Sequence, residues 1–169
     1  MSRLDILGEM NTILGQIERT LYENRRHFAK LNTKGEILSD QAQEWAAILD
    51  DKTGLVWEYK STTGKHERNR QFVWSANHQE IEGHIQETNE ENLAGCQDWR
   101  LPNLEELQIL VASGLDRRYF GPMVGADGFT SLFVAQQEPS EIGQALDWEE
   151  EIVLFVEKAH VMLCSGHKS

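Results

Sequence analysis

The first 31 residues carry apolar side chains at heptad spacing. The eight residues of this stripe are Leu7, Met10, Leu14, Ile17, Leu21, Asn24, Phe28 and Leu31. All but Asn24 are apolar, so the pattern predicts a long, coiled-coil-like amphipathic helix over residues 1–34. A single asparagine in such a stripe sets the register between neighbouring helices. We therefore expect this helix to gather several copies of the chain into a homo-oligomer.

Two other uses of the same stripe remain open. An amphipathic helix can dock on the body of its own chain, or it can lie on a membrane surface. The polar face mixes Glu9, Glu18 and Glu23 with arginines, which disfavours binding to anionic lipid. Docking on the chain's own body therefore stays as the main alternative to oligomerisation.

From Trp45 onward the apolar residues alternate as they do in strands. The alternating positions are Trp45, Ala47 and Leu49 before a turn at residues 50–54, and Leu55, Trp57 and Tyr59 after it. This arrangement predicts a β-hairpin, and Gly54 is the position where we expect a positive φ. Another short strand is predicted at Phe72–Trp74.

Two helices are predicted in the middle of the chain. The first covers residues 79–94, and its inward positions are Ile81, His84, Ile85, Thr88 and Leu93. The second begins at Leu104, because Asn103 and Glu106 have the spacing of a reciprocal cap. It ends near Gly114.

The C-terminal part reads mainly as short strands. We expect a strand near residues 129–134 and a polar loop through Ala145. Two apolar runs, 152–156 and 159–164, read as antiparallel strands joined at residues 157–158. Short helices mixed with short strands predict an α+β fold for a single domain over residues 35–169.

Charge and composition disfavour several classes of binding partner. The chain has 16 basic and 28 acidic side chains, a net charge of −12, and residues 35–169 alone carry ten against 24, or −14. Such a body disfavours nucleic acid, anionic membranes and sulfated polymers as partners. No apolar run is long enough to span a membrane, and the N-terminus lacks a signal-peptide pattern. As written, the chain is expected in the cytoplasm, with export by another route as the alternative.

Three stretches together resemble the Lcl C-terminal domain family, named after a domain of a bacterial collagen-like adhesin. They are WAAILDDKTGLVWEYK at residues 45–60, FVW at 72–74 and AGCQDWRLPNLEELQILV at 94–111. The resemblance covers roughly residues 44–165. It implies a C-type-lectin-like domain, related in fold to the formylglycine-generating enzymes, in which two helices flank a short twisted antiparallel sheet. It also implies a surface or secreted binding module.

Candidate binding residues are few. A local basic patch for a ligand would come from Arg68, Arg70, Arg117 and Arg118, and Trp148 is a further candidate contact. Residues Asp98, Trp99, Arg100 and Pro102 more often pack and pair than bind a ligand. A hard cation such as calcium has weak candidates in Asp147, Glu149 and Glu150, but no twelve-residue calcium loop is present. We expect no other metal and no cofactor.

Catalytic motifs are missing from the sequence. No nucleophile elbow, metal-binding HExxH or glycine-rich phosphate loop occurs, so we predict no catalytic residue. The two cysteines, Cys96 and Cys164, fit reduced thiols or at most one bridge. We expect a non-catalytic recognition module that binds a protein or a carbohydrate. The alternatives are an enzyme of the formylglycine-generating type and an intracellular scaffold or assembly component.

Overall fold

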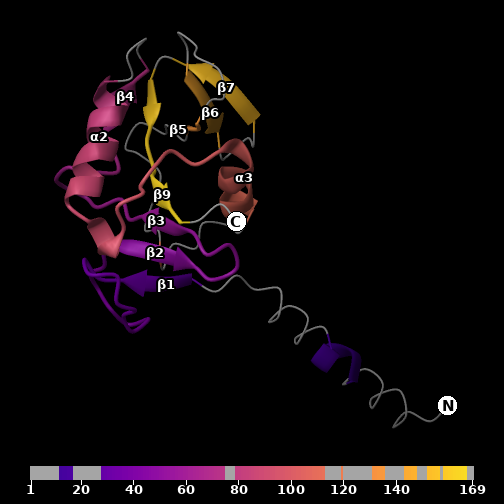
Figure 1. Cartoon of the computed structure of the whole chain (residues 1–169). Coiled ribbons are helices and arrows are strands. Elements are labelled where there is room, and N and C mark those ends of the chain that lie inside the picture. The colour runs from indigo at the N-terminus through magenta and orange to yellow at the C-terminus, as the bar shows by residue number, and fades with distance from the viewer. Residues whose placement is uncertain are drawn as a thin grey trace.

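A computed structural model describes residues 12–16, 28–74, 79–112, 119, 131–135, 143–147, 152–156 and 158–166. Its strands form two small sheets, with two helices beside them (Figure 1). The α+β class predicted from the sequence is confirmed at this level. Among the described residues, no helix is long and apolar enough to cross a membrane.

The first sheet is antiparallel throughout and has the order β1-β2-β3-β9. Its strands are β1 (Phe28–Leu31), β2 (Ala47–Asp50), β3 (Val56–Glu58) and β9 (Cys164–Ser165). The first and last of these strands are more than 130 positions apart in the chain, since β1 begins at Phe28 and β9 begins at Cys164. The sheet therefore joins the two ends of the described body.

The hairpin predicted around residues 50–54 is confirmed. Ile48 pairs with Trp57 across β2 and β3, and Gly54 has a φ of 70°. The Gly54 amide donates to the Asp50 carbonyl at 2.8 Å, and the Thr53 hydroxyl donates to the Asp50 carboxylate, also at 2.8 Å. The turn thus satisfies its own polar groups, as a turn rich in Asp and Thr is expected to do.

Strand β2 is buried on both faces. Ala47 belongs to one hydrophobic cluster, together with Phe72 and Trp99, whereas Ile48 belongs to a second cluster with Trp57. The first sheet therefore lies between two cores. This placement explains why the strand reads AILD rather than as an alternation of apolar and polar residues.

The second sheet is mixed and has the order β4-β8-β5-β6-β7. Its strands are β4 (Gln71–Val73), β5 (Ser131–Phe133), β6 (Gly143–Asp147), β7 (Ile152–Val156) and β8 (Lys158–His160). Strand β8 pairs antiparallel with β4 and parallel with β5. Both predicted strands at Phe72–Trp74 and near residues 129–134 are confirmed here.

Both central helices are present. Helix α2 (Gln79–Glu90) buries Ile81, His84 and Thr88, and α3 (Leu104–Ala112) buries Leu107 and Leu110. The cap of α3 is confirmed, because the Glu106 amide donates to Asn103 Oδ1 and the Asn103 amide donates to Glu106 Oε2, both at 2.8 Å.

Helix α2 ends four residues earlier than predicted. Asn92 and Ala94 have φ values of 56° and 52°, which a right-handed helix cannot accommodate. A short 3₁₀ turn, η1 (Leu93–Gly95), replaces the last predicted turn and still buries Leu93.

The prediction of one helix over residues 1–34 is wrong over residues 28–31. Residues 12–16 are helical, but Phe28 and Leu31 lie in β1, where Phe28 pairs with Asp50 and Leu31 with Ala47. Both side chains are buried in the body. Their spacing of three suits either element, and the open edge of β2 supplies the hydrogen bonds that select the strand. Five stripe residues lie outside the described chain: Leu7, Met10, Ile17, Leu21 and Asn24.

Two predictions in the C-terminal part are also wrong. Residues 143–145, expected at the end of a polar loop, lie in strand β6, in which Ala145 and Leu146 are buried between β5 and β7. The two terminal runs do not pair with each other, since β7 pairs with β6 and β8 pairs with β4 and β5. Because β8 lies between β4 and β5, the backbone groups on both of its edges have hydrogen-bond partners. Pairing with β7 alone would leave the backbone groups of one edge without partners.

Candidate functional site

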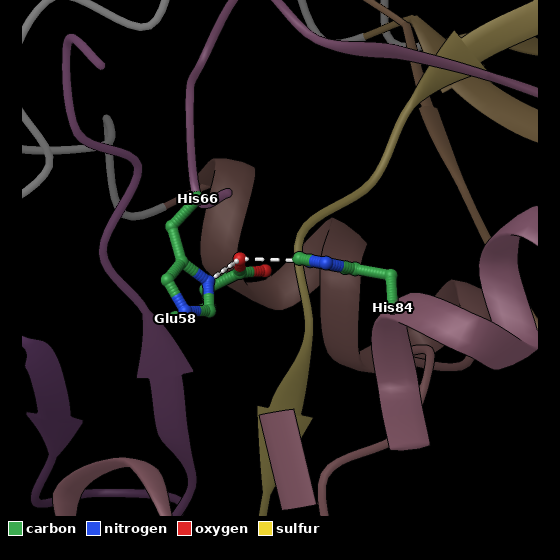
Figure 2. Close-up of side chains that lie close together, drawn as sticks. All are labelled: Glu58, His66 and His84. Carbon is green, nitrogen blue, oxygen red and sulfur yellow. Dashed lines mark hydrogen bonds and ion pairs between the residues drawn. The ribbon is translucent and has the colours of Figure 1, made fainter. Parts of the chain in front are cut away.

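A buried carboxylate, Glu58 at the end of β3, is the centre of a polar cluster (Figure 2). Its Oε1 atom lies 2.8 Å from Lys60 Nζ, 2.7 Å from His66 Nδ1 and 3.0 Å from His84 Nε2. Its Oε2 atom accepts a hydrogen bond from the Leu163 amide at 2.9 Å. Glu58 and His84 have no exposed side-chain surface, and only 15% of the His66 side chain is exposed. We call Glu58, Lys60, His66 and His84 the Glu58 cluster.

Three separate elements bring these side chains together. Strand β3 presents Glu58, and the following residues form a loop closed by pairing of Ser61 with Glu67. The Ser61 amide donates to the His66 carbonyl at 2.9 Å, which fixes the loop so that His66 turns back toward β3. His84 comes from the buried face of α2. The cluster therefore links a sheet, a loop and a helix.

Glu58 stays charged despite its burial. Loss of solvent raises the pKa of the Glu58 carboxyl, but the Lys60 charge and the hydrogen bonds from His66 and His84 act in the opposite direction. The net effect holds the pKa well below its usual value. A paired buried carboxylate of this kind is strongly anchored, and removal of one partner leaves a costly charge behind.

The cluster continues outward through His66. His66 Nε2 lies 3.4 Å from Glu91 Oε2, and Glu91 also pairs with Lys65. Burial raises the pKa of the Glu91 carboxyl, but the hydrogen bonds from Lys65 and His66 lower it by more. The net effect is a lowered pKa. His66 therefore bridges an inner and an outer carboxylate.

His84 is held differently. Its Nε2 atom contacts Glu58, its ring lies 5.1 Å from the Phe72 ring, and its Nδ1 atom is buried with no hydrogen-bond partner among the described residues. A proton on Nε2 lets the ring donate to Glu58 and leaves Nδ1 without a proton, which avoids an unpaired buried N–H group. The tautomer is thus set by the hydrogen bond to Glu58.

The predicted packing residues form a second, separate cluster. Trp99 is buried and donates from Nε1 to the Leu93 carbonyl at 3.1 Å. Arg100 donates from two nitrogens to the two Glu106 oxygens, both at 2.8 Å. Asp98 accepts hydrogen bonds from the Ser165 hydroxyl and, at 3.2 Å, from the Gly166 amide. Pro102 is buried, and its carbonyl accepts from the Ala135 amide at 2.8 Å.

The remaining candidates are dispersed. Arg68 and Arg70 lie on the loop between β3 and β4, both partly buried, and the Arg70 guanidinium lies 4.5 Å above the Phe72 ring. Five other candidates fall outside the described chain: Arg117, Arg118, Trp148, Glu149 and Glu150. Asp147 ends strand β6. Cys96 and Cys164 are not joined by a disulfide, and Cys164 Sγ lies 4.0 Å from Glu106 Oε2.

Two surface hollows lie elsewhere. One of about 590 Å³ lies over α2 and the following turn, and its lining residues are Glu82, Ile85, Gln86, Asn89, Glu90 and Gln97. A smaller one of about 230 Å³ is lined by residues of α3 and by Leu146. No residue of the Glu58 cluster lines either of them. Glu58 and His84 have no exposed side-chain surface, so the centre of the cluster is buried.

Sequence reasoning missed this site. His84 was expected only as an inward helix position, and Glu58 and His66 were not candidates. Glu58 and Lys60 carried one available signal, since two charged residues two positions apart on a strand share a face of the sheet. Nothing in the spacing of residues 58, 66 and 84 indicates that loop 61–67 folds back on the strand.

The fold and the sequence comparison agree on the class of domain. A mixed α+β body built on a four-stranded antiparallel sheet with two helices carries a family match over residues 46–150 to the Lcl C-terminal domain. The match covers more than half of the chain, which therefore belongs to the Lcl C-terminal domain family. Neither the curated proteins nor the solved structures give a significant match.

Proposed function

We propose that the chain is a non-catalytic recognition module with a lectin-like body, oligomerised through its N-terminal helix and binding a protein or carbohydrate partner. The observation that carries the proposal is the exposure of Ile13 and Leu14, at 54% and 53%, in the helical residues 12–16. Figure 1 places this segment apart from the two sheets. Its apolar side chains do not pack on the body.

Self-association gives these side chains a partner. Burial of apolar surface is worth about 25 cal/mol per Å², and heptad stripes bury it against copies of themselves. Several heads on one assembly then bind a repetitive partner with more avidity than one head alone. A binding site with weak affinity on each head is therefore enough for tight binding by the whole assembly.

The arrangement of ionisable groups supports binding rather than catalysis. Among the described residues, those with clearly shifted pKa values include Glu58, Glu91, Asp98 and Arg100, and all four are held by internal hydrogen bonds or ion pairs. None of them lines either surface hollow. Acid–base catalysis needs such a group within reach of a substrate.

Loop 61–70 is the proposed contact surface for the partner. It carries Lys65, Arg68 and Arg70 against one acidic residue, Glu67, on an otherwise acidic body. The Phe72 ring orders the Arg70 guanidinium, so little side-chain entropy is lost when a ligand binds. Acidic groups of a protein or a saccharide fit this loop.

Light scattering on the full chain tests the oligomer. We expect an oligomer for the wild type and monomers with folded bodies for Leu14→Asp, because the charge removes the central apolar position. Gln16→Asp introduces the same charge on the opposite, polar side of the helix and should leave the assembly intact. A monomeric wild type at tens of micromolar, about the affinity range of such assemblies, contradicts the proposal.

A saccharide array tests the contact surface. The oligomeric wild type should retain acidic saccharides, and Arg68→Ala combined with Arg70→Ala should weaken retention at least tenfold. Equal retention by both proteins would remove loop 61–70 from the proposal. Binding to none of the saccharides would leave a protein as the partner.

A further inference from the structure

We propose that the Glu58 cluster is a binding site for one divalent transition-metal ion of the Zn²⁺ type, with Glu58, His66 and His84 as its protein ligands. One carboxylate oxygen and two imidazole nitrogens form a ligand set suited to such an ion. The three ligand atoms lie within 4.8 Å of one another. His66 lies on loop 61–70, but Arg68 and Arg70, which test the partner surface, are not metal ligands, so the two proposals are tested by different residues.

Two of the three ligand separations need only a small adjustment to admit an ion. A tetrahedral zinc about 2.0–2.1 Å from each ligand separates its ligand atoms by about 3.3 Å. Glu58 Oε1 lies 2.7 Å from His66 Nδ1 and 3.0 Å from His84 Nε2. Both contacts therefore open by a few tenths of an ångström, and the two imidazole nitrogens, which lie within 4.8 Å of each other, come to about 3.3 Å apart. His66, on the surface loop and partly exposed, marks the side from which an ion enters (Figure 2).

The surroundings already orient two of the ligands. Leu163 donates its amide to Glu58 Oε2, so Oε1 is directed at the imidazoles. His66 presents Nδ1 to the site, and its Nε2 lies 3.4 Å from Glu91 Oε2. A carboxylate behind a ligating histidine is the usual support of protein metal sites, because it fixes the ring and increases its basicity. Glu91 is thus a positioning residue for His66.

Lys60 is bound to the same Glu58 oxygen that would bind the ion. Its Nζ atom lies 2.8 Å from Glu58 Oε1, and an ammonium and a divalent ion on one buried oxygen repel each other strongly. Binding of the ion therefore requires the Lys60 side chain to move away from the Glu58 carboxylate. In the metal-free protein the ammonium balances the Glu58 charge. In the loaded protein the ion balances it, and the ring protons move to His66 Nε2 and His84 Nδ1, so that the two ligating nitrogens are unprotonated.

Titration of the chelator-treated full chain with Zn²⁺, followed by calorimetry, tests the site. We expect one ion per chain for the wild type and at least a hundredfold weaker binding for His66→Ala, a change on the partly exposed loop that spares the core. Glu91→Gln should weaken binding about tenfold. Glu82→Gln alters an exposed carboxylate of the same helix as His84 and should change nothing.

Lys60→Met gives the sharpest distinction. If the lysine competes with the ion, this variant binds Zn²⁺ at least tenfold more tightly than the wild type, although its metal-free form is less stable. Cobalt substitution should add visible absorption bands typical of tetrahedral coordination, and these bands should be lost in His66→Ala. The proposal is overturned if the wild type binds no Zn²⁺ at micromolar concentrations, or if His66→Ala binds as well as the wild type.

Discussion

The Glu58 carboxylate accepts the Leu163 amide at 2.9 Å, across 105 positions of the chain. Glu58 also donates its own amide to the Leu163 carbonyl at 2.9 Å, so the two residues exchange hydrogen bonds. One of these bonds belongs to a charged side chain in a solvent-free interior. The C-terminal segment is therefore held to the first sheet by a charge as well as by backbone pairing.

Removal of this charge should destabilise the fold. We expect Glu58→Gln to cost about 3–5 kcal/mol, because Lys60 is left as an unpaired buried cation. Urea denaturation in the presence of a chelator measures the loss. The double variant Glu58→Gln with Lys60→Met removes both charges and should recover part of the stability. If the double variant is no more stable than Glu58→Gln, the pairing argument is wrong.

Asp98 provides a pH-dependent contribution to stability. The hydrogen bond from Ser165, helped by the Gly166 amide and the nearby Arg100 charge, outweighs partial burial and lowers the pKa of Asp98. A carboxyl whose pKa is lower in the folded state binds fewer protons there, so its contribution is present above about pH 4 and is lost as the pH falls through the folded value.

Ser165→Ala should move the pKa of Asp98 back toward its ordinary value. Carboxyl carbon shifts followed by NMR during acid titration measure this change directly. Ser61→Ala is the matched control, since its hydroxyl donates to the Thr63 carbonyl instead. An unchanged Asp98 titration in Ser165→Ala would show that another group lowers the pKa.

Two buried tryptophans differ in a single hydrogen bond. Trp99 Nε1 donates to the Leu93 carbonyl at 3.1 Å, whereas Trp57 Nε1 is buried with no partner among the described residues. Replacement by Phe removes similar volume at both sites. We expect Trp99→Phe to cost about 1 kcal/mol more than Trp57→Phe in urea denaturation, because only Trp99→Phe loses a hydrogen bond. Equal losses would argue against this difference.

The cap of α3 should be worth a measurable amount. Asn103→Ala removes the acceptor for the Glu106 amide, and we expect a loss of about 1 kcal/mol. Thermal denaturation followed by circular dichroism measures it. Gln108→Ala, an exposed change within the same helix, should stay within about 0.5 kcal/mol of the wild type.

Local signals were read correctly where a few neighbouring residues suffice. The hairpin around Gly54 and the start of α3 depend on turn and cap chemistry within four or five positions, and both are as predicted. The strand at residues 28–31 was missed because it forms only where β2 supplies a pairing partner. Strand β6 was missed because its sequence, GQALD, has no clear alternation of apolar and polar residues, although it pairs with its sequence neighbours β5 and β7. Phe28 and Leu31 fit a heptad stripe and a strand equally well until β2 is beside them.

The sequence by itself determined the family, the α+β class, the hairpin and the capped helix, since these follow from short-range spacing and from specific residue types. Only the tertiary structure decided which strands are neighbours and that Glu58, His66 and His84 meet. Those residues come from a strand, a loop and a helix. Glu58 and His84 are 26 positions apart, and no periodic pattern in the sequence between them indicates their contact. Burial then turned a weakly informative glutamate into a charge held by a lysine, two histidines and a backbone amide.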